Sequence, residues 1–173
     1  VEAVILAIDP AKKCSGYAIL VPEYDDETQI FLNSYEVEVF GTVGESHQAL
    51  RREVVESAAT MADGMGCPLV IVAENWSAGG KRMTYSTYVG LGVGWGMWLA
   101  EIYACNIPAH CITRPLPQQW KGRLLGHIAK GESKQTAQQY VQDVGLVSFP
   151  VGGDIADALC MGRWAAYSQE AWT

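Results

Sequence analysis

Four acidic residues stand out by their placement in the sequence: Asp9, Glu74, Asp154 and Asp157. Asp9 and Glu74 each end an apolar run, where a carboxylate is unusual unless something neutralises it. Asp154 and Asp157 are three residues apart at the start of an expected helix, so both project from one face. An Asp-Pro turn or a helix cap explains each acid taken alone. Together they would concentrate negative charge that needs cations, and hard oxygen ligands favour Mg²⁺ or Mn²⁺.

The elements that must position these acids are predicted from the spacing of apolar residues. Residues 4–8 and 69–73 are continuous apolar runs, typical of strands buried on both faces. Strands expected over 16–21 and 29–40 follow the first through short turns, which predicts an antiparallel meander. The remaining expected elements are a strand over 109–113, helices over 46–65, 84–105, 133–144 and 154–170, and a helical start at Gln118. This order predicts an α/β fold with a mixed five-stranded sheet flanked by helices, in a single domain spanning 1–173.

Three segments that contain the four acids resemble the motifs of RuvC-type Holliday-junction resolvases, in the ribonuclease H-like superfamily. The sequence AIDPAKKCSGYA at 7–18 resembles their opening motif, VIVAEN at 70–75 the second, and GDIADAL at 153–159 the third. The motifs occur in the family's order over nearly the whole chain. One departure is Ala11, where the family usually has glycine, so the turn after Asp9 can differ in conformation.

The resemblance implies a nuclease that resolves four-way junctions by paired symmetric nicks. The four acids would hold two Mg²⁺ ions, with Mn²⁺ able to substitute, for in-line attack of water on a phosphodiester. Lys121 and Lys134 occupy positions where the family carries basic residues near the scissile phosphate, and they are carried over as catalytic residues. Solvated surface lysines are the alternative interpretation of both.

The resemblance also implies contacts with branched DNA and with a second copy of the chain. The candidate DNA-binding residues are Lys81, Arg82, Trp76, Tyr85, Lys121, Arg123, Lys130 and Lys134. Either Trp76 or Tyr85 is expected to stack on an unpaired base. The expected helix over 84–105 contains four alternate glycines, which indicates close packing. The family dimerises through this helix, so Gly90, Gly94, Trp95 and Trp98 are candidate interface residues, with packing inside the chain as the alternative.

The charge of the chain is distributed unevenly. The sequence has 173 residues, 49% of them hydrophobic, and its net charge of −7 argues at first against a nucleic-acid ligand. Residues 23–63 hold ten acidic residues against two arginines, whereas residues 81–134 hold seven basic residues against two acidic ones. The sequence therefore predicts a basic part that faces DNA and an acidic part turned away from it.

The five cysteines include no C-x-x-C pair, which predicts free thiols in a reducing compartment. No signal peptide or apolar run long enough to span a bilayer is evident. These features favour the cytoplasm of a bacterium or of a phage-infected cell, and no membrane partner.

Two other functions stay open. One is a non-catalytic or regulatory module of the same fold that binds branched DNA, and the other is a nuclease for a different branched DNA. An actin-like ATPase also begins with a strand that bears an aspartate. That class needs a second lobe and glycine-rich phosphate motifs, which this sequence lacks, so no nucleotide cofactor is expected.

Overall fold

The computed structural model describes residues 2–75, 84–126 and 131–168. Its strands form one five-stranded sheet in the order β3-β2-β1-β4-β5. The strands are β1 (Val4–Asp9), β2 (Cys14–Tyr24), β3 (Phe31–Gly44), β4 (Leu69–Ala73) and β5 (Ile112–Thr113). The β1–β2 and β2–β3 pairs are antiparallel, and the β1–β4 and β4–β5 pairs are parallel. The predicted mixed sheet with a three-stranded meander is therefore confirmed.

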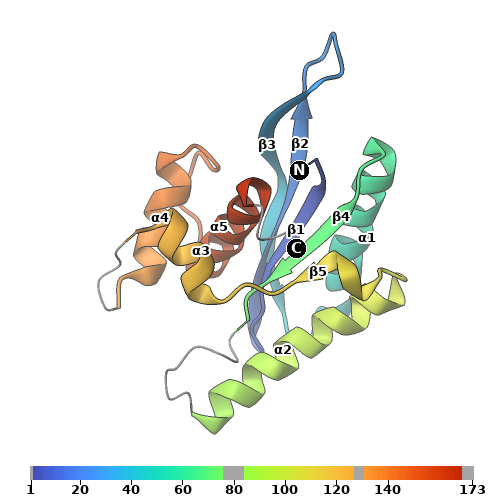
Figure 1. The fold of residues 1–173 in the computed structure, drawn as a ribbon. Coiled ribbons are helices and arrows are strands. Elements are labelled where there is room, and N and C mark those ends of the chain that lie inside the picture. Colours follow the sequence, from blue (N-terminus) through green and yellow to red (C-terminus); the bar gives the residue numbers. More distant parts are fainter. Residues whose placement is uncertain (1, 76–83, 127–130, 169–173) are drawn as a thin grey trace.

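The helices cover both faces of the sheet. They are α1 (Gln48–Met65), α2 (Tyr85–Ala104), α3 (Pro117–Leu124), α4 (Ser133–Asp143) and α5 (Gly153–Tyr167). Helices α3, α4 and α5 lie on one side and α1 and α2 on the other (Figure 1). Alternate side chains of β1 supply the two cores, because successive residues of a strand point to opposite faces.

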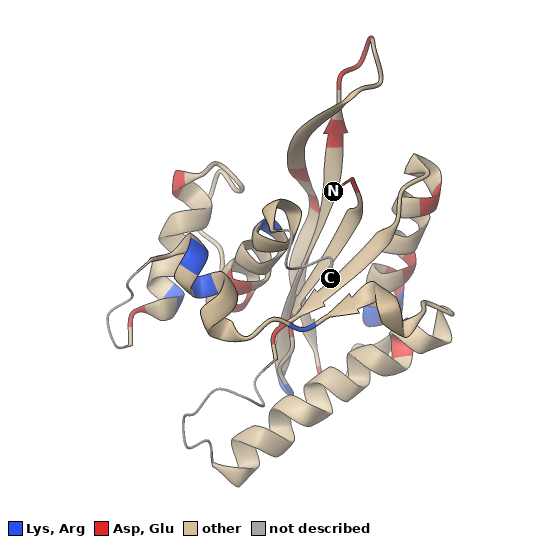
Figure 2. Cartoon of the chain, viewed as in Figure 1, with Lys and Arg blue, Asp and Glu red and all other residues tan. Residues whose placement is uncertain are grey.

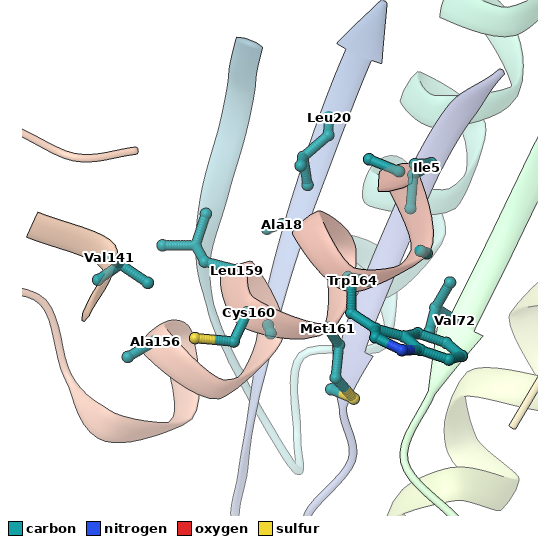
Figure 3. Close-up of a cluster of buried hydrophobic side chains, with 14 of the residues drawn as sticks. Ile5, Ala18, Leu20, Val72, Val141, Ala156, Leu159, Cys160, Met161 and Trp164 are labelled. Atoms are coloured by element: carbon teal, nitrogen blue, oxygen red, sulfur yellow. The ribbon is translucent and has the colours of Figure 1, made fainter. Parts of the chain in front are cut away.

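The core beneath α5 fixes the position of that helix on the sheet. Leu159, Met161 and Trp164 of α5 pack with Leu20 of β2 and Val72 of β4 (Figure 3). All five side chains are at most 3% exposed, so together they bury a large apolar area. The start of α5 is thereby held at a defined place relative to β1 and β2.

Three elements differ in extent from the sequence prediction. Strand β2 is longer than expected at both ends, because it pairs with β3 up to Tyr24 in the projecting hairpin (Figure 1) and from Cys14 at its other end. Strand β3 begins later than expected at the hairpin and ends later, at Gly44, opposite Cys14. Residues Ala109–Cys111 form a 3-10 turn, η1, and only Ile112 and Thr113 belong to a strand. Proline at 115 lacks the N–H that a continued β5 ladder needs, so the strand is short.

All five cysteines are free thiols, as the sequence predicted. Within the described ranges, no helix is both long and apolar enough to cross a membrane.

Candidate active site

The first two acids meet at the carboxyl ends of β1 and β4. These strands are parallel neighbours with Ile8 opposite Ala73, so the next residue of each chain segment is Asp9 or Glu74. The carboxyl ends of adjacent parallel strands are where α/β sheets build their sites. On its other side, Asp9 pairs with Gly16 of β2.

Gly16 is the residue that lets the other two acids approach. A Cβ atom at this position would lie 2.0 Å from the carbonyl oxygen of Asp154, so the backbone of α5 rests directly on β2. This contact brings the first turns of α5, with Asp154 and Asp157, to the edge that carries Asp9. The sequence interpretation did not single out Gly16. A glycine inside a strand was the available signal, because it often marks close approach of another backbone.

The electrostatics show that the four acids share one site. Burial raises the pKa of Asp9 well above its ordinary value, and repulsion from Asp157, Glu74 and Asp154 raises it further. Burial is also the largest cause of the raised pKa of Glu74 and of Asp157, which the ammonium group of Lys121 partly opposes. Full ionisation of this cluster is therefore costly unless cations neutralise it.

Two lysines supply positive charge to the cluster from separate helices. Lys121 of α3 places its Nζ 3.3 Å from Asp157 Oδ2 and 3.9 Å from Glu74 Oε1. The same ammonium lies 4.6 Å from the ring centroid of Trp120, which is fully buried and fixes α3 in the core. Lys134 of α4 donates to Asp154, and this hydrogen bond raises its pKa. The structure thus brings together all six residues predicted to be catalytic.

The donor set fits a hard divalent cation. Glu74 Oε1 and Asp157 Oδ1 are buried and have no hydrogen-bond partner within the described part of the chain. Buried carboxylate oxygens without a donor are costly, and oxygen ligands are those that Mg²⁺ and Mn²⁺ prefer. Among residues 2–75, 84–126 and 131–168, no three His, Cys, Asp or Glu side chains form a ready-made metal site. Three of the carboxylates are instead paired with lysines.

The predicted DNA-binding residues fall into two groups. Tyr85 at the start of α2 is 85% exposed, and Arg123 of α3 is exposed while it donates to Ser168 Oγ. Trp76, Lys81, Arg82 and Lys130 lie outside the described residues. Figure 2 shows the basic residues of α3 and α4 beside the acidic site, with acidic residues of the β2–β3 hairpin at the far end of the molecule.

The predicted dimer interface requires a correction. Trp98 is fully buried, Trp95 is 7% exposed, and a Cβ at Gly94 would lie 2.5 Å from the carbonyl carbon of Ala11. These three residues pack inside the chain, so their prediction as interface residues is wrong. The spacing of Trp95, Trp98 and Ile102 is that of a helix face directed at a core. Gly90 is half-buried, a Cβ built on it would lie 3.7 Å from Lys12 Cβ, and its role stays a prediction.

The chain resembles solved structures over nearly its full length. One is RuvC of T. thermophilus in complex with a Holliday junction substrate, at a TM-score of 0.68 and 18% identity, covering 99% of this chain and 98% of that one. Another is a Thermus thermophilus RuvC structure, at a TM-score of 0.58 and 20% identity, covering 96% of both chains. No protein-family model and no curated protein matches the sequence. The mixed sheet and its flanking helices therefore give this chain the fold of the RuvC Holliday-junction resolvases.

Proposed function

We propose that this protein is a divalent-metal-dependent endonuclease that resolves four-way DNA junctions. The observation that carries the proposal is the meeting of four carboxylates from β1, β4 and α5 with two lysines from α3 and α4. Structural stability does not require such a cluster, since repulsion and lost hydration raise the pKa values of three of its members. The likeness in fold to RuvC supports the choice of substrate.

The four acids would hold two Mg²⁺ ions, or Mn²⁺ in their place. When bound, such ions supply an activated water and neutralise charge at the departing 3′-oxygen. The chain's own contribution is to hold four oxygen donors in a partly buried place, so that bulk water is limited. Lys121 and Lys134 hold protonated amines beside these donors, where they can turn toward a non-bridging phosphate oxygen.

DNA would approach the end of the sheet that carries the four acids. Lys121, Lys134 and Arg123 present positive charge there, and Tyr85 offers an exposed ring that can stack on an unpaired base. We propose that Trp76 can stack in the same way and that Lys81, Arg82 and Lys130 also contact the DNA. The acidic β2–β3 hairpin at the far end repels phosphates and so favours this orientation.

Paired nicks require two active sites, and we propose a homodimer that uses the exposed face of α2. Tyr88, Val89 and Val93 are 52%, 41% and 41% exposed, which is unusual for apolar side chains on one helix. At Gly92 and Gly96 on the same helix, no described residue outside the helix lies within 4 Å of where a Cβ would be, so a second backbone can come close. A two-fold dimer matches the two-fold symmetry of a four-way junction.

The test is cleavage of a panel of synthetic DNAs in Mg²⁺ and in Mn²⁺: a four-way junction, a three-way junction, a flap and a linear duplex. We expect two nicks at symmetry-related positions of the four-way junction and little cleavage of the duplex. Preferred cleavage of the flap or the three-way junction would support the nuclease for other branched DNA. Junction binding without cleavage in either metal would support the non-catalytic module and contradict the proposal.

A further inference from the structure

Arg114 connects the segment that carries Glu74 to helix α2. Its Nη2 donates to the main-chain carbonyl of Glu74 at 3.0 Å. Its guanidinium lies over the ring of Trp95, 5.0 Å from the centroid. The sequence interpretation counts Arg114 only among the basic residues of the DNA-facing part, whereas the structure directs its side chain inward, to Glu74 and Trp95.

A second hydrogen bond joins the segment that carries Glu74 to the segment that carries Arg114. The amide of Asn75 donates to the carbonyl of Pro115 at 2.8 Å. Strands β4 and β5 pair only through Ile71 and Val72 with Ile112 and Thr113. The two added bonds extend the connection past the ends of both strands, and both engage the peptide group between Glu74 and Asn75, so the chain is held directly after the Cα atom of Glu74.

Helix α2 also contacts the segment that carries Asp9. Gly94, the neighbour of Trp95, lies against the backbone of Ala11, two residues beyond Asp9. Of two consecutive residues of α2, Gly94 therefore lies against the segment that presents Asp9, and Trp95 lies against Arg114, which is hydrogen-bonded to Glu74. Trp95 itself is fixed, because it is 7% exposed and packs in the core beneath α2.

An arginine side chain is well suited to make both contacts at once. The planar guanidinium can stack on an indole while its edge donates to a carbonyl, whereas a lysine ammonium offers no plane to stack. A stacked and hydrogen-bonded side chain loses freedom, and so it restrains the groups that it joins. Surrounding groups that hold a metal ligand in place are commonly needed for metal affinity.

We propose that Arg114, stacked on Trp95, is a positioning residue that holds Glu74 for metal binding and links that acid to α2. This inference rests on the proposed function, because it takes Glu74 to be a metal ligand. It adds that α2 supports the site from within while its outer face remains available to a second subunit.

The test uses Arg114→Leu, Trp95→Leu and the double variant, with Trp95→Phe as the conservative change. Arg163→Leu is the matched control, since Arg163 makes the same two kinds of contact with Tyr140 and Tyr167 on α4 and α5. Three readouts are taken: exchange of the Asn75 amide by NMR, Mn²⁺ affinity by electron paramagnetic resonance, and kcat against KM for junction cleavage.

We expect each leucine variant to speed Asn75 exchange and to weaken Mn²⁺ binding about tenfold. The kcat for junction cleavage should fall, and KM should stay unchanged. The double variant should show losses no larger than those of the more damaged single variant, because both substitutions remove the same Arg114–Trp95 contact, called the clamp below. Trp95→Phe should retain most of the wild-type affinity, and Arg163→Leu should leave all three readouts unchanged.

Wild-type Asn75 exchange and Mn²⁺ affinity in Arg114→Leu would overturn the inference, as would equal losses in Arg163→Leu. If a leucine variant does not fold, Arg114→Lys decides: faster Asn75 exchange at an unchanged melting temperature supports the clamp, and wild-type exchange contradicts it. If wild-type protein and an Asp9→Asn variant bind Mn²⁺ equally, the proposed function fails instead, while Asn75 exchange still tests the clamp.

Discussion

At the scale of single residues, the site combines carboxylates that are raised in pKa with ammonium groups that partly neutralise them. Lys121 lies between Glu74 and Asp157, and Lys134 pairs with Asp154. Asp9 receives repulsion from all three other acids, and Lys121 opposes that repulsion only in part. The chain without divalent cations is therefore expected to be less stable than the same fold with fewer charges at this place.

The cost of ionising these buried carboxyls predicts that the free energy of unfolding falls as the pH rises. Burial and repulsion raise the pKa values of Asp9, Glu74 and Asp157 in the folded chain above their unfolded-state pKa values of about 4. The stability that comes from protonating these carboxyls is therefore fully present below those unfolded-state pKa values. That contribution is lost as the pH rises through the raised values. Without divalent cations, Asp9→Asn should therefore have a higher free energy of unfolding than wild type at pH 8.

Urea unfolding of both proteins between pH 3.5 and pH 8, in a chelator, measures this difference. The gap should close toward the acidic end, where the wild-type carboxyl is protonated as well. A gap of the opposite sign at pH 8, or one that does not vary with pH, would contradict the electrostatic description of Asp9.

At the scale of elements, backbone contacts at glycines determine how the helices approach the acids. Gly16 admits α5 to β2, and Gly94 admits α2 to the turn after Asp9. Among the described residues beyond its own helical turns, none comes within 4 Å of the place where a Cβ of Gly92, two residues earlier on α2, would lie. Among the glycines of α2, Gly94 is therefore needed for a close backbone contact, whereas Gly92 is not.

The pair Gly94→Ala and Gly92→Ala separates these two cases. Gly94→Ala should destabilise the fold by about 1–3 kcal/mol, because the new methyl group must displace the backbone at Ala11. Gly92→Ala should stabilise it by about 0.5–1 kcal/mol, since alanine loses less backbone entropy in a helix. Chemical denaturation of both variants at protein concentrations that keep the assembly state fixed measures the difference, and similar effects would contradict the packing of α2.

The same elements show what the sequence could predict. Apolar periodicity located β1, β4 and α1, because those segments bury side chains with a regular spacing. The four acids could be expected to meet because they stand at strand ends and at a helix start. The roles of Gly94 and Gly16 could not be derived in this way, since a contact with another backbone leaves no apolar pattern.

The lysines and Arg114 show a different limit. Lys121 and Lys134 were chosen through the family resemblance, and their spacing from the acids carries no local signal, because α3 and α4 reach the site only in the folded chain. Arg114 was not assigned a role, since its hydrogen-bond acceptor is a main-chain carbonyl, which every residue has.

At the scale of the whole molecule, charge is separated between two ends. The β2–β3 hairpin and α1 hold most of the acidic residues outside the site, while α3 and α4 hold lysines and an arginine beside it (Figure 2). The net charge of −7 is thus compatible with a DNA ligand that contacts only one end. With few phosphate contacts available, shape of the DNA should contribute more to selection than overall charge attraction.

We propose that the four acids make this end of the molecule a metal-dependent nuclease. The most direct test compares wild type with Asp9→Asn on a labelled four-way junction in Mg²⁺, with junction binding measured separately in Ca²⁺. Wild type should nick two strands at symmetric positions. Asp9→Asn should bind the junction as tightly but cut it at least about a hundredfold more slowly, a loss of transition-state stabilisation of about 2.7 kcal/mol. Equal cleavage by the two proteins, or no cleavage by wild type, would contradict the claim.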